Sequence, residues 1–141
     1  MDRVVIDASV AIKWTIEEEN SAEALTLASS SALVAPRLVL TECANILWRK
    51  VRLGQVSARN AVEWHDDLSL TPIEYMEDHA LLPHALALAI DLDHPVYDCL
   101  YLAASEACGA PLVTADVRLH RKLAGNGRLK IPPVLLRDLG L

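Results

Sequence analysis

The sequence of 141 residues has no phenylalanine, and aromatic residues make up only 4% of it. Its five glycines form neither a GxGxxG motif nor a GK[ST] loop, so nucleotide binding of the Rossmann or P-loop kind lacks its phosphate-binding turn. No GxSxG motif is present, which argues against serine hydrolase chemistry. The five histidines lie outside any HExxH motif and the three cysteines form no CxxC pair, so zinc binding is not expected.

Signals for export and membrane insertion are also missing. The sequence opens on the strand-like segment RVVID, without the basic start and apolar stretch of a signal peptide. No apolar run reaches the roughly 20 residues that a membrane span needs. Cys43, Cys99 and Cys108 are an odd number of cysteines in apolar segments, which is typical of reduced thiols in a core. We therefore expect a cytoplasmic protein without membrane contact.

The net charge of -6 argues at first against a nucleic-acid partner, because binding to phosphates depends on Lys and Arg. The charges are unevenly distributed, however. Residues 117–141 contain six of the 13 basic residues and, in Asp138, one of the 19 acidic residues. The basic ones are Arg118, Arg121, Lys122, Arg128, Lys130 and Arg137. This segment is a candidate basic patch for RNA, although a solvated helix face explains the same charges equally well.

The order of elements indicates one α/β domain over residues 1–141. Short apolar segments predict buried strands at 3–6, 33–35, 71–75, 112–114 and 131–134. Helical spacing and capping residues predict helices over 20–29, 38–53 and 57–70, from Asp78, over 98–108 and from Asp116. Because strands alternate with helices, we expect a mainly parallel central sheet with helices on both faces, which is a three-layer α/β/α fold.

Four acidic residues occupy places where a lone charge would be costly. They are Asp7 after RVVI, Glu42 within LVLTECANIL, Asp98 within PVYDCLYLA and Asp116 after PLVTA. Asp7 and Asp116 follow predicted strands, and ligands of parallel sheets bind at the carboxyl ends of the strands. Carboxylate ligands without His or Cys favour Mg²⁺ or Mn²⁺ over zinc. Such an ion can activate water and stabilise the charge on a phosphate, so phosphodiester hydrolysis is the predicted reaction.

Each acid taken alone also has a structural explanation. Asp98 and Asp116 can be helix N-caps, Asp7 can close a turn, and Glu42 can pair with Arg49 two turns further along its helix. Arg49 can equally point toward the acids and contact a phosphate. Four acids at strand ends and helix starts of one sheet favour a shared site over four independent roles.

These segments together resemble the PIN-domain nucleases, and especially the VapC toxins of toxin-antitoxin pairs. The resemblance spans essentially the whole chain and rests on VIDAS, TECAN, VYDCLYLAAS and PLVTAD in this order. It implies that Asp7, Glu42, Asp98 and Asp116 are the catalytic, metal-binding acids, with Mg²⁺ or possible Mn²⁺ as cofactor. It further implies supporting hydrogen bonds from Ser9, Asn45 and Thr114, endonucleolytic cleavage of RNA, a homodimer, and inhibition by a VapB-like antitoxin.

The resemblance leaves the RNA-binding surface open, and the residues that we expect there are Arg49, Arg118, Arg121 and Lys122. Two other functions remain possible on the sequence alone. One is a catalytically silent PIN-like module that holds RNA or a partner protein. The other is a phosphoacceptor domain of the receiver type, which needs a lysine after a late strand, where Lys122 and Lys130 are poorly placed.

Overall fold

A computed structural model describes residues 1–141, which form a five-stranded, wholly parallel sheet with strand order β3-β2-β1-β4-β5. The strands are β1 (Arg3–Ile6), β2 (Ala32–Pro36), β3 (Ile73–Met76), β4 (Leu112–Thr114) and β5 (Val134–Leu135). Val4, Val5 and Ile6 of the central strand β1 are completely buried. Both faces of the sheet are covered, which is why the strands read as apolar runs rather than alternating patterns. The predicted parallel sheet is confirmed.

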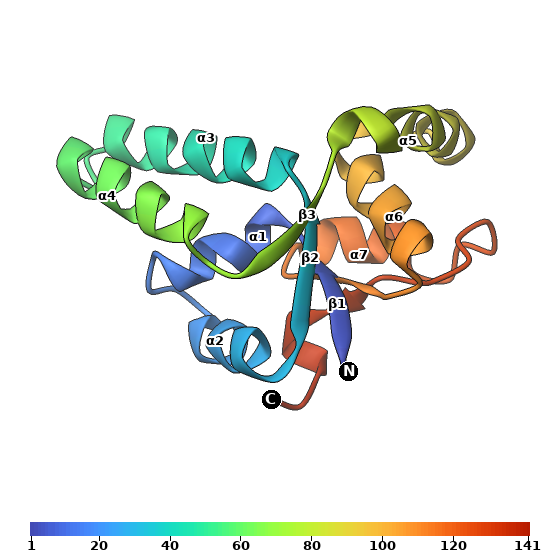
Figure 1. Cartoon of the computed structure of the whole chain (residues 1–141), viewed down its shortest axis with the longest axis horizontal. Coiled ribbons are helices and arrows are strands. Elements are labelled where there is room, and N and C mark those ends of the chain that lie inside the picture. Colours follow the sequence, from blue (N-terminus) through green and yellow to red (C-terminus); the bar gives the residue numbers. More distant parts are fainter.

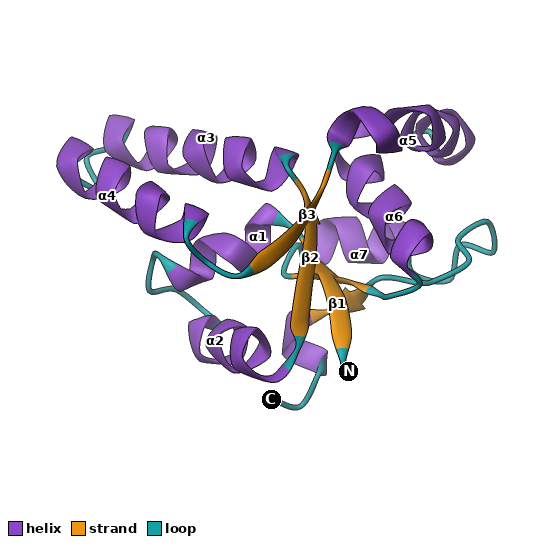
Figure 2. Ribbon diagram, viewed as in Figure 1, coloured by secondary structure: helices purple, strands orange, loops and turns teal.

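Helices cover both faces of the sheet (Figure 1, Figure 2). They are α1 (Ala8–Ala11), α2 (Ser21–Ser30), α3 (Leu38–Arg52), α4 (Ala58–Ser69), α5 (Asp78–Leu92), α6 (Val96–Cys108) and α7 (Val117–Leu123), with 3-10 turns η1 (Ile12–Trp14) and η2 (Leu136–Asp138). In Figure 1, α1 to α4 lie on one side of the strands and α5 and α6 on the other. The α3-α4 hairpin projects beyond the sheet, and the three-layer arrangement is as predicted.

Several helix ends follow the predicted chemistry. Ser57 caps α4 by accepting a hydrogen bond from the Asn60 amide at 3.0 Å. Gly109 ends α6 with a positive φ of 67°, a conformation that glycine adopts at little cost. Cys43 and Cys99 are buried free thiols, as expected, and Cys108 is half-buried. No helix has both the length and the apolar character that a membrane crossing requires.

Other local predictions were wrong. Asp78 does not cap its own helix, because Glu77 holds the N-cap position and the Asp78 carboxylate accepts from the Leu38 amide at 3.1 Å, at the start of α3. Asn20 does hold the N-cap position of α2, but its side chain makes no capping bond. The last strand, β5, begins only at Val134. The short helices α1 and η1 were not predicted, because four and three residues are too few to show helical periodicity.

Candidate metal centre

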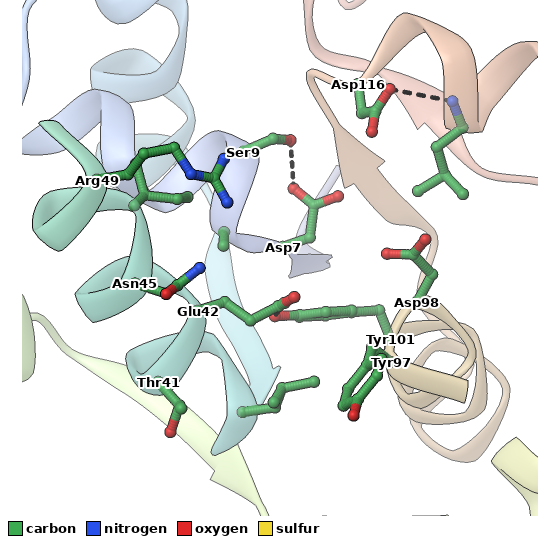
Figure 3. A pocket seen from close by; sticks show the side chains of 14 residues that line it. Asp7, Ser9, Thr41, Glu42, Asn45, Arg49, Tyr97, Asp98, Tyr101 and Asp116 are labelled. Carbon is green, nitrogen blue, oxygen red and sulfur yellow. Dashed lines mark hydrogen bonds between the residues drawn. The ribbon is translucent and has the colours of Figure 1, made fainter. Parts of the chain in front are cut away.

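All four predicted acids line one cavity of about 450 Å³ at the carboxyl ends of the strands (Figure 3). Asp7 follows β1 directly and Asp116 follows β4, whereas Glu42 lies in α3 and Asp98 in the first turn of α6. Strands β1 and β4 are neighbours at the centre of the sheet, where the chain reverses the direction in which it adds strands. A crevice at such a reversal is the usual ligand site of an open parallel sheet.

Asp7 is the most buried of the four acids, with only 6% of its surface exposed. Its Oδ1 accepts a hydrogen bond from the Ser9 hydroxyl at 2.5 Å and one from the Val10 amide at 3.3 Å, so Asp7 caps α1. Burial raises the pKa of Asp7 to about 6, and the negative charge of Asp98 adds to the rise, while the hydrogen bonds of Ser9, Thr114 and Val10 oppose it. In the metal-free protein, ionisation of Asp7 therefore costs free energy.

Ser9 joins the two strand ends that hold the acids. Its hydroxyl donates to Asp7 and accepts from the Ala115 amide at 2.8 Å, next to Asp116. The hydroxyl of Thr114 lies 3.3 Å from that of Ser9 and accepts from the Asp116 amide at 3.1 Å. This series of hydrogen bonds runs from Asp7 through Ser9 and Thr114 to Asp116. It fixes the spacing of two acids that are 109 positions apart in sequence. These hydrogen bonds are what a supporting role of Ser9 and Thr114 needs, and that role stays a prediction.

Replacing Ser9 by Ala is expected to loosen this connection. The variant leaves the Ala115 amide without its acceptor and Oδ1 of Asp7 with the Val10 amide as its remaining donor, and a lost partner of this kind costs about 1–3 kcal/mol. Urea denaturation of the metal-free protein measures this loss. Ser29→Ala is the matched control, because the Ser29 hydroxyl bonds only to a carbonyl on the exposed face of α2. Equal stability of the two variants would contradict the bridging role.

Glu42 approaches the cavity from α3 and is half-buried. Its Oε1 accepts a hydrogen bond from the hydroxyl of Tyr101, a fully buried residue of α6. Burial raises the pKa of Glu42, the charges of Asp98 and Asp78 add to this, and the Tyr101 hydrogen bond opposes it. The alternative pairing with Arg49 is wrong, since Glu42 takes part in no ion pair and its partner is Tyr101.

Asp98 and Asp116 each use one oxygen within the protein. Oδ2 of Asp98 accepts from Nε2 of His94 at 2.6 Å, and Asp98 is not the N-cap of α6, a position that Pro95 holds. Oδ1 of Asp116 caps α7 by accepting from the Arg118 and Leu119 amides at 3.0 and 3.1 Å. The capping explanation is therefore confirmed for Asp116 and wrong for Asp98. In both residues the second carboxylate oxygen remains for another ligand.

The donor set fits a hard divalent cation, because it consists of carboxylates that line one cavity and form no ion pair with Lys or Arg. The acids are not drawn together tightly enough for three of them to hold an ion as they stand. Repulsion is a physical reason for this spacing, since the charge of Asp98 already raises the pKa of both Asp7 and Glu42. A cation would have to draw the side chains inward.

The remaining predicted residues divide into two groups. Asn45 and Arg49 lie on α3 and line the same cavity, and Figure 3 shows the Arg49 guanidinium on the side of Ser9. Arg118, Arg121 and Lys122 lie on α7 and do not line it. Lys122 donates to the Asp93 carbonyl at 2.8 Å, so its ammonium group is already engaged.

Other basic side chains of the segment 117–141 are also engaged with groups of the protein, which weakens the case for a basic patch there. Arg128 pairs with Asp91 at 3.6 Å, and Arg137 lies 3.9 Å from Asp138. Arg118 and Arg121 are exposed and make no ion pair. Three of the six basic side chains are thus engaged with groups of the protein itself, and the cation best placed beside the acids is Arg49.

Sequence reasoning missed three side chains near the acids. Tyr101 and Tyr97 line the cavity, and Tyr97 is 61% exposed. The third is His94, one of the five histidines considered above only as zinc ligands, which donates to Asp98. The spacing held a usable signal for Tyr101, which follows Asp98 by three positions, a separation that brings helical neighbours together. His94 gave no such signal, because it precedes α6.

The fold is a parallel α/β sheet with four carboxylates around a cavity at its central reversal, which defines a candidate centre for a divalent cation. The PIN-domain family model matches residues 4–125. Ribonuclease VapC3 of Pyrobaculum aerophilum is 32% identical over 126 residues, which cover 85% of this chain and 94% of that protein. Ribonuclease VapC9 of Mycobacterium tuberculosis is 32% identical over 119 residues, covering 82% and 87%. The chain belongs to the PIN-domain family, among the VapC proteins.

Solved structures agree on the fold. A crystal structure from Pyrobaculum aerophilum has a TM-score of 0.71 at 24% identity, covering 98% of this chain and 86% of that one. VapC20 of Mycobacterium tuberculosis, described as a toxin that cleaves the sarcin-ricin loop, has a TM-score of 0.66 at 17% identity, covering 81% and 90%. A chain of a toxin-antitoxin complex from Klebsiella pneumoniae has a TM-score of 0.57 at 14% identity, covering 93% and 98%. At these identities the likeness concerns the fold alone.

Proposed function

We propose that this chain is a metal-dependent endoribonuclease and the toxin of a toxin-antitoxin pair. The observation that carries the proposal is the gathering of Asp7, Glu42, Asp98 and Asp116 around one cavity at the centre of a PIN-domain sheet. The curated relatives, which are named ribonucleases and are covered almost end to end, support RNA as the substrate.

The four carboxylates would hold Mg²⁺, or Mn²⁺ in its place. The bound ion would supply Lewis-acid stabilisation of the scissile phosphate and a deprotonated water at neutral pH. Ser9 and Thr114 hold Asp7 and the Asp116 segment in position through their hydrogen bonds. Arg49, on the rim of the cavity, is placed to bind the phosphate that enters it, and the Asn45 amide one turn earlier can donate to the same group.

A protein partner is supported by two apolar surfaces that the domain leaves uncovered. A cavity of about 380 Å³ lies between α3 and α4, where Trp48 and Val62 are 55% and 65% exposed. On α5, Leu82, Leu86 and Ile90 form an exposed row at helical spacing. Such surfaces on a small domain mark interaction sites. A VapB-like antitoxin and a second copy of the chain are the partners that we propose.

The decisive experiment compares cleavage of structured RNAs by wild type and by Asp98→Asn, with Mg²⁺, with Mn²⁺ and with EDTA. Transfer RNAs and a hairpin with the sarcin-ricin sequence serve as substrates. We expect metal-dependent internal cuts that EDTA abolishes and that the variant makes at least about 100-fold more slowly, because it loses a charged ligand. His79→Asn changes an exposed residue outside the cavity and is the control.

The same proteins separate catalysis from silent binding. If Mn²⁺ raises the melting temperature of wild type but not of Asp98→Asn, the ion binds at the acids, because a ligand of the folded state alone stabilises it. Wild type that binds both metal and RNA tightly but cuts none of the RNAs would replace the nuclease proposal by the silent-module alternative.

A further inference from the structure

The turn before α6 carries a histidine that is fixed against one of the four acids. Nε2 of His94 lies 2.6 Å from Oδ2 of Asp98, and the imidazole side chain is only 11% exposed. Its other nitrogen, Nδ1, is buried and has no hydrogen-bond partner. The imidazole ring therefore makes one hydrogen bond, from Nε2 to Asp98.

The backbone holds this histidine in place from several sides. Asp93, just before it, has a left-handed φ of 51°, and its carbonyl accepts from Nζ of Lys122 in α7 at 2.8 Å. The His94 amide donates to the Ala89 carbonyl at 3.0 Å. Pro95 follows as the N-cap residue of α6, and its ring restricts the backbone of the residue before it. The imidazole is therefore preorganised and does not have to be ordered when the cavity is filled.

The bond also decides which oxygen of Asp98 stays available. Oδ2 is taken by His94, so Oδ1 is the atom left for a ligand in the cavity. A carboxylate on an exposed first turn would otherwise rotate about its side-chain torsions, and Asp98 is 38% exposed. Partners that orient a ligating carboxylate typically change metal affinity about 10- to 100-fold when they are removed.

We propose that His94 is a positioning residue of the metal centre, which orients the Asp98 carboxylate toward the ion through its Nε2 hydrogen bond. This inference rests on the proposed function, because it takes Asp98 to be a metal ligand. His94 itself does not contact the ion. The affinity for the metal would thus depend on the conformation of the α5-α6 turn, which Lys122 stabilises through its hydrogen bond to Asp93.

Two substitutions, His94→Gln and His94→Asn, test whether the Nε2 hydrogen bond positions Asp98. Their side chains both end in an amide and differ in length by one carbon atom. A glutamine side chain can place its amide nitrogen where Nε2 of histidine lies, whereas the shorter asparagine places it near Nδ1. We expect Mn²⁺ affinity, measured by titration calorimetry on the full chain, to fall about 10- to 100-fold in His94→Asn and to stay close to wild type in His94→Gln. His94→Leu, which packs but has no donor, takes the place of the Asn variant if that one does not fold.

The Asp98→Asn background separates positioning from a general structural role. If His94 acts through Asp98, adding His94→Asn to Asp98→Asn causes little further loss of Mn²⁺ binding. Undiminished binding by His94→Asn, or equal losses in the Asn and Gln variants, would overturn the role of His94 while leaving the metal centre intact. Wild type that binds no Mn²⁺ would overturn the metal centre itself, and the role of His94 with it.

Discussion

Asp7→Asn is expected to abolish RNA cleavage and, in the same molecule, to stabilise the metal-free protein. Asparagine keeps the oxygen that accepts from Ser9 and Val10, so the hydrogen bonds at Oδ1 survive. It removes the buried negative charge, which is the part of Asp7 that costs free energy without a cation. The cleavage rate should fall about 1,000-fold, which corresponds to about 4 kcal/mol of barrier.

The sign of the stability change follows from the pKa of Asp7. The carboxyl has a pKa of about 6 in the folded protein against an ordinary value of 3.8. Between these two values the folded state binds more protons than the unfolded state, so the free energy of unfolding of wild type falls as the pH rises. The loss reaches about 3 kcal/mol once the pH exceeds 6. Because asparagine does not titrate, the variant escapes this loss.

Urea denaturation in EDTA at pH 4 and pH 7.5 measures the difference. We expect Asp7→Asn to exceed wild type by about 2–3 kcal/mol at pH 7.5 and by little at pH 4. Asp116→Asn is the control, because that residue is exposed and asparagine serves as an N-cap as well as aspartate does. A variant that is less stable than wild type at pH 7.5 would mean that the buried charge is compensated in a way that this structure does not contain.

The conflict between charge and burial at Asp7 is also what made the site predictable from sequence. A carboxylate directly after the apolar segment RVVI, and another inside the apolar stretch around Glu42, are local contradictions that a fold tolerates at a functional site. The parallel topology then brings strand ends together whatever lies between them. The meeting of Asp7 and Asp116 at one edge follows from this topology because both residues directly follow a strand, whereas the order of the strands was not predicted.

The partners of the acids could not be predicted in the same way, because they depend on how helices pack. Tyr101 reaches Glu42 only because α6 lies against the sheet across from α3, over a separation of 59 positions in sequence. The Asp78 carboxylate serves α3 rather than its own helix for a similar reason. Local propensity places a residue on an element, whereas the neighbour that its side chain contacts is a property of the assembled layers.

Charge counting along the chain could not show which basic side chains stay free to bind RNA. The excess of basic residues in 117–141 suggested a patch for RNA, yet Lys122 and Arg128 are engaged with a turn and a helix end of the same domain. Their positive charges meet carbonyl and carboxylate groups around Asp91 and Asp93, near the end of α5. A basic segment identifies a binding surface only when its side chains remain free of such contacts.

Tyr101→Phe is expected to weaken metal binding in a way that depends on pH. The Tyr101 hydroxyl is the one group that lowers the pKa of Glu42 against the effects of burial, Asp98 and Asp78. Burial and the charge of Glu42 hold the pKa of Tyr101 itself far above its ordinary value, so the hydroxyl remains a donor throughout the useful pH range. Without it, the pKa of Glu42 rises further, and protons compete with the cation for this carboxylate.

Mn²⁺ titrations at pH 6 and pH 8 therefore separate this effect from a simple loss of packing. We expect the affinity of Tyr101→Phe to lie further below wild type at pH 6 than at pH 8, because a higher pKa of Glu42 makes protons a stronger competitor at the lower pH. Tyr97→Phe is the matched control, because it removes the hydroxyl of an exposed tyrosine in the same cavity. An equal loss at both pH values would show that Tyr101 orients Glu42 without tuning its ionisation.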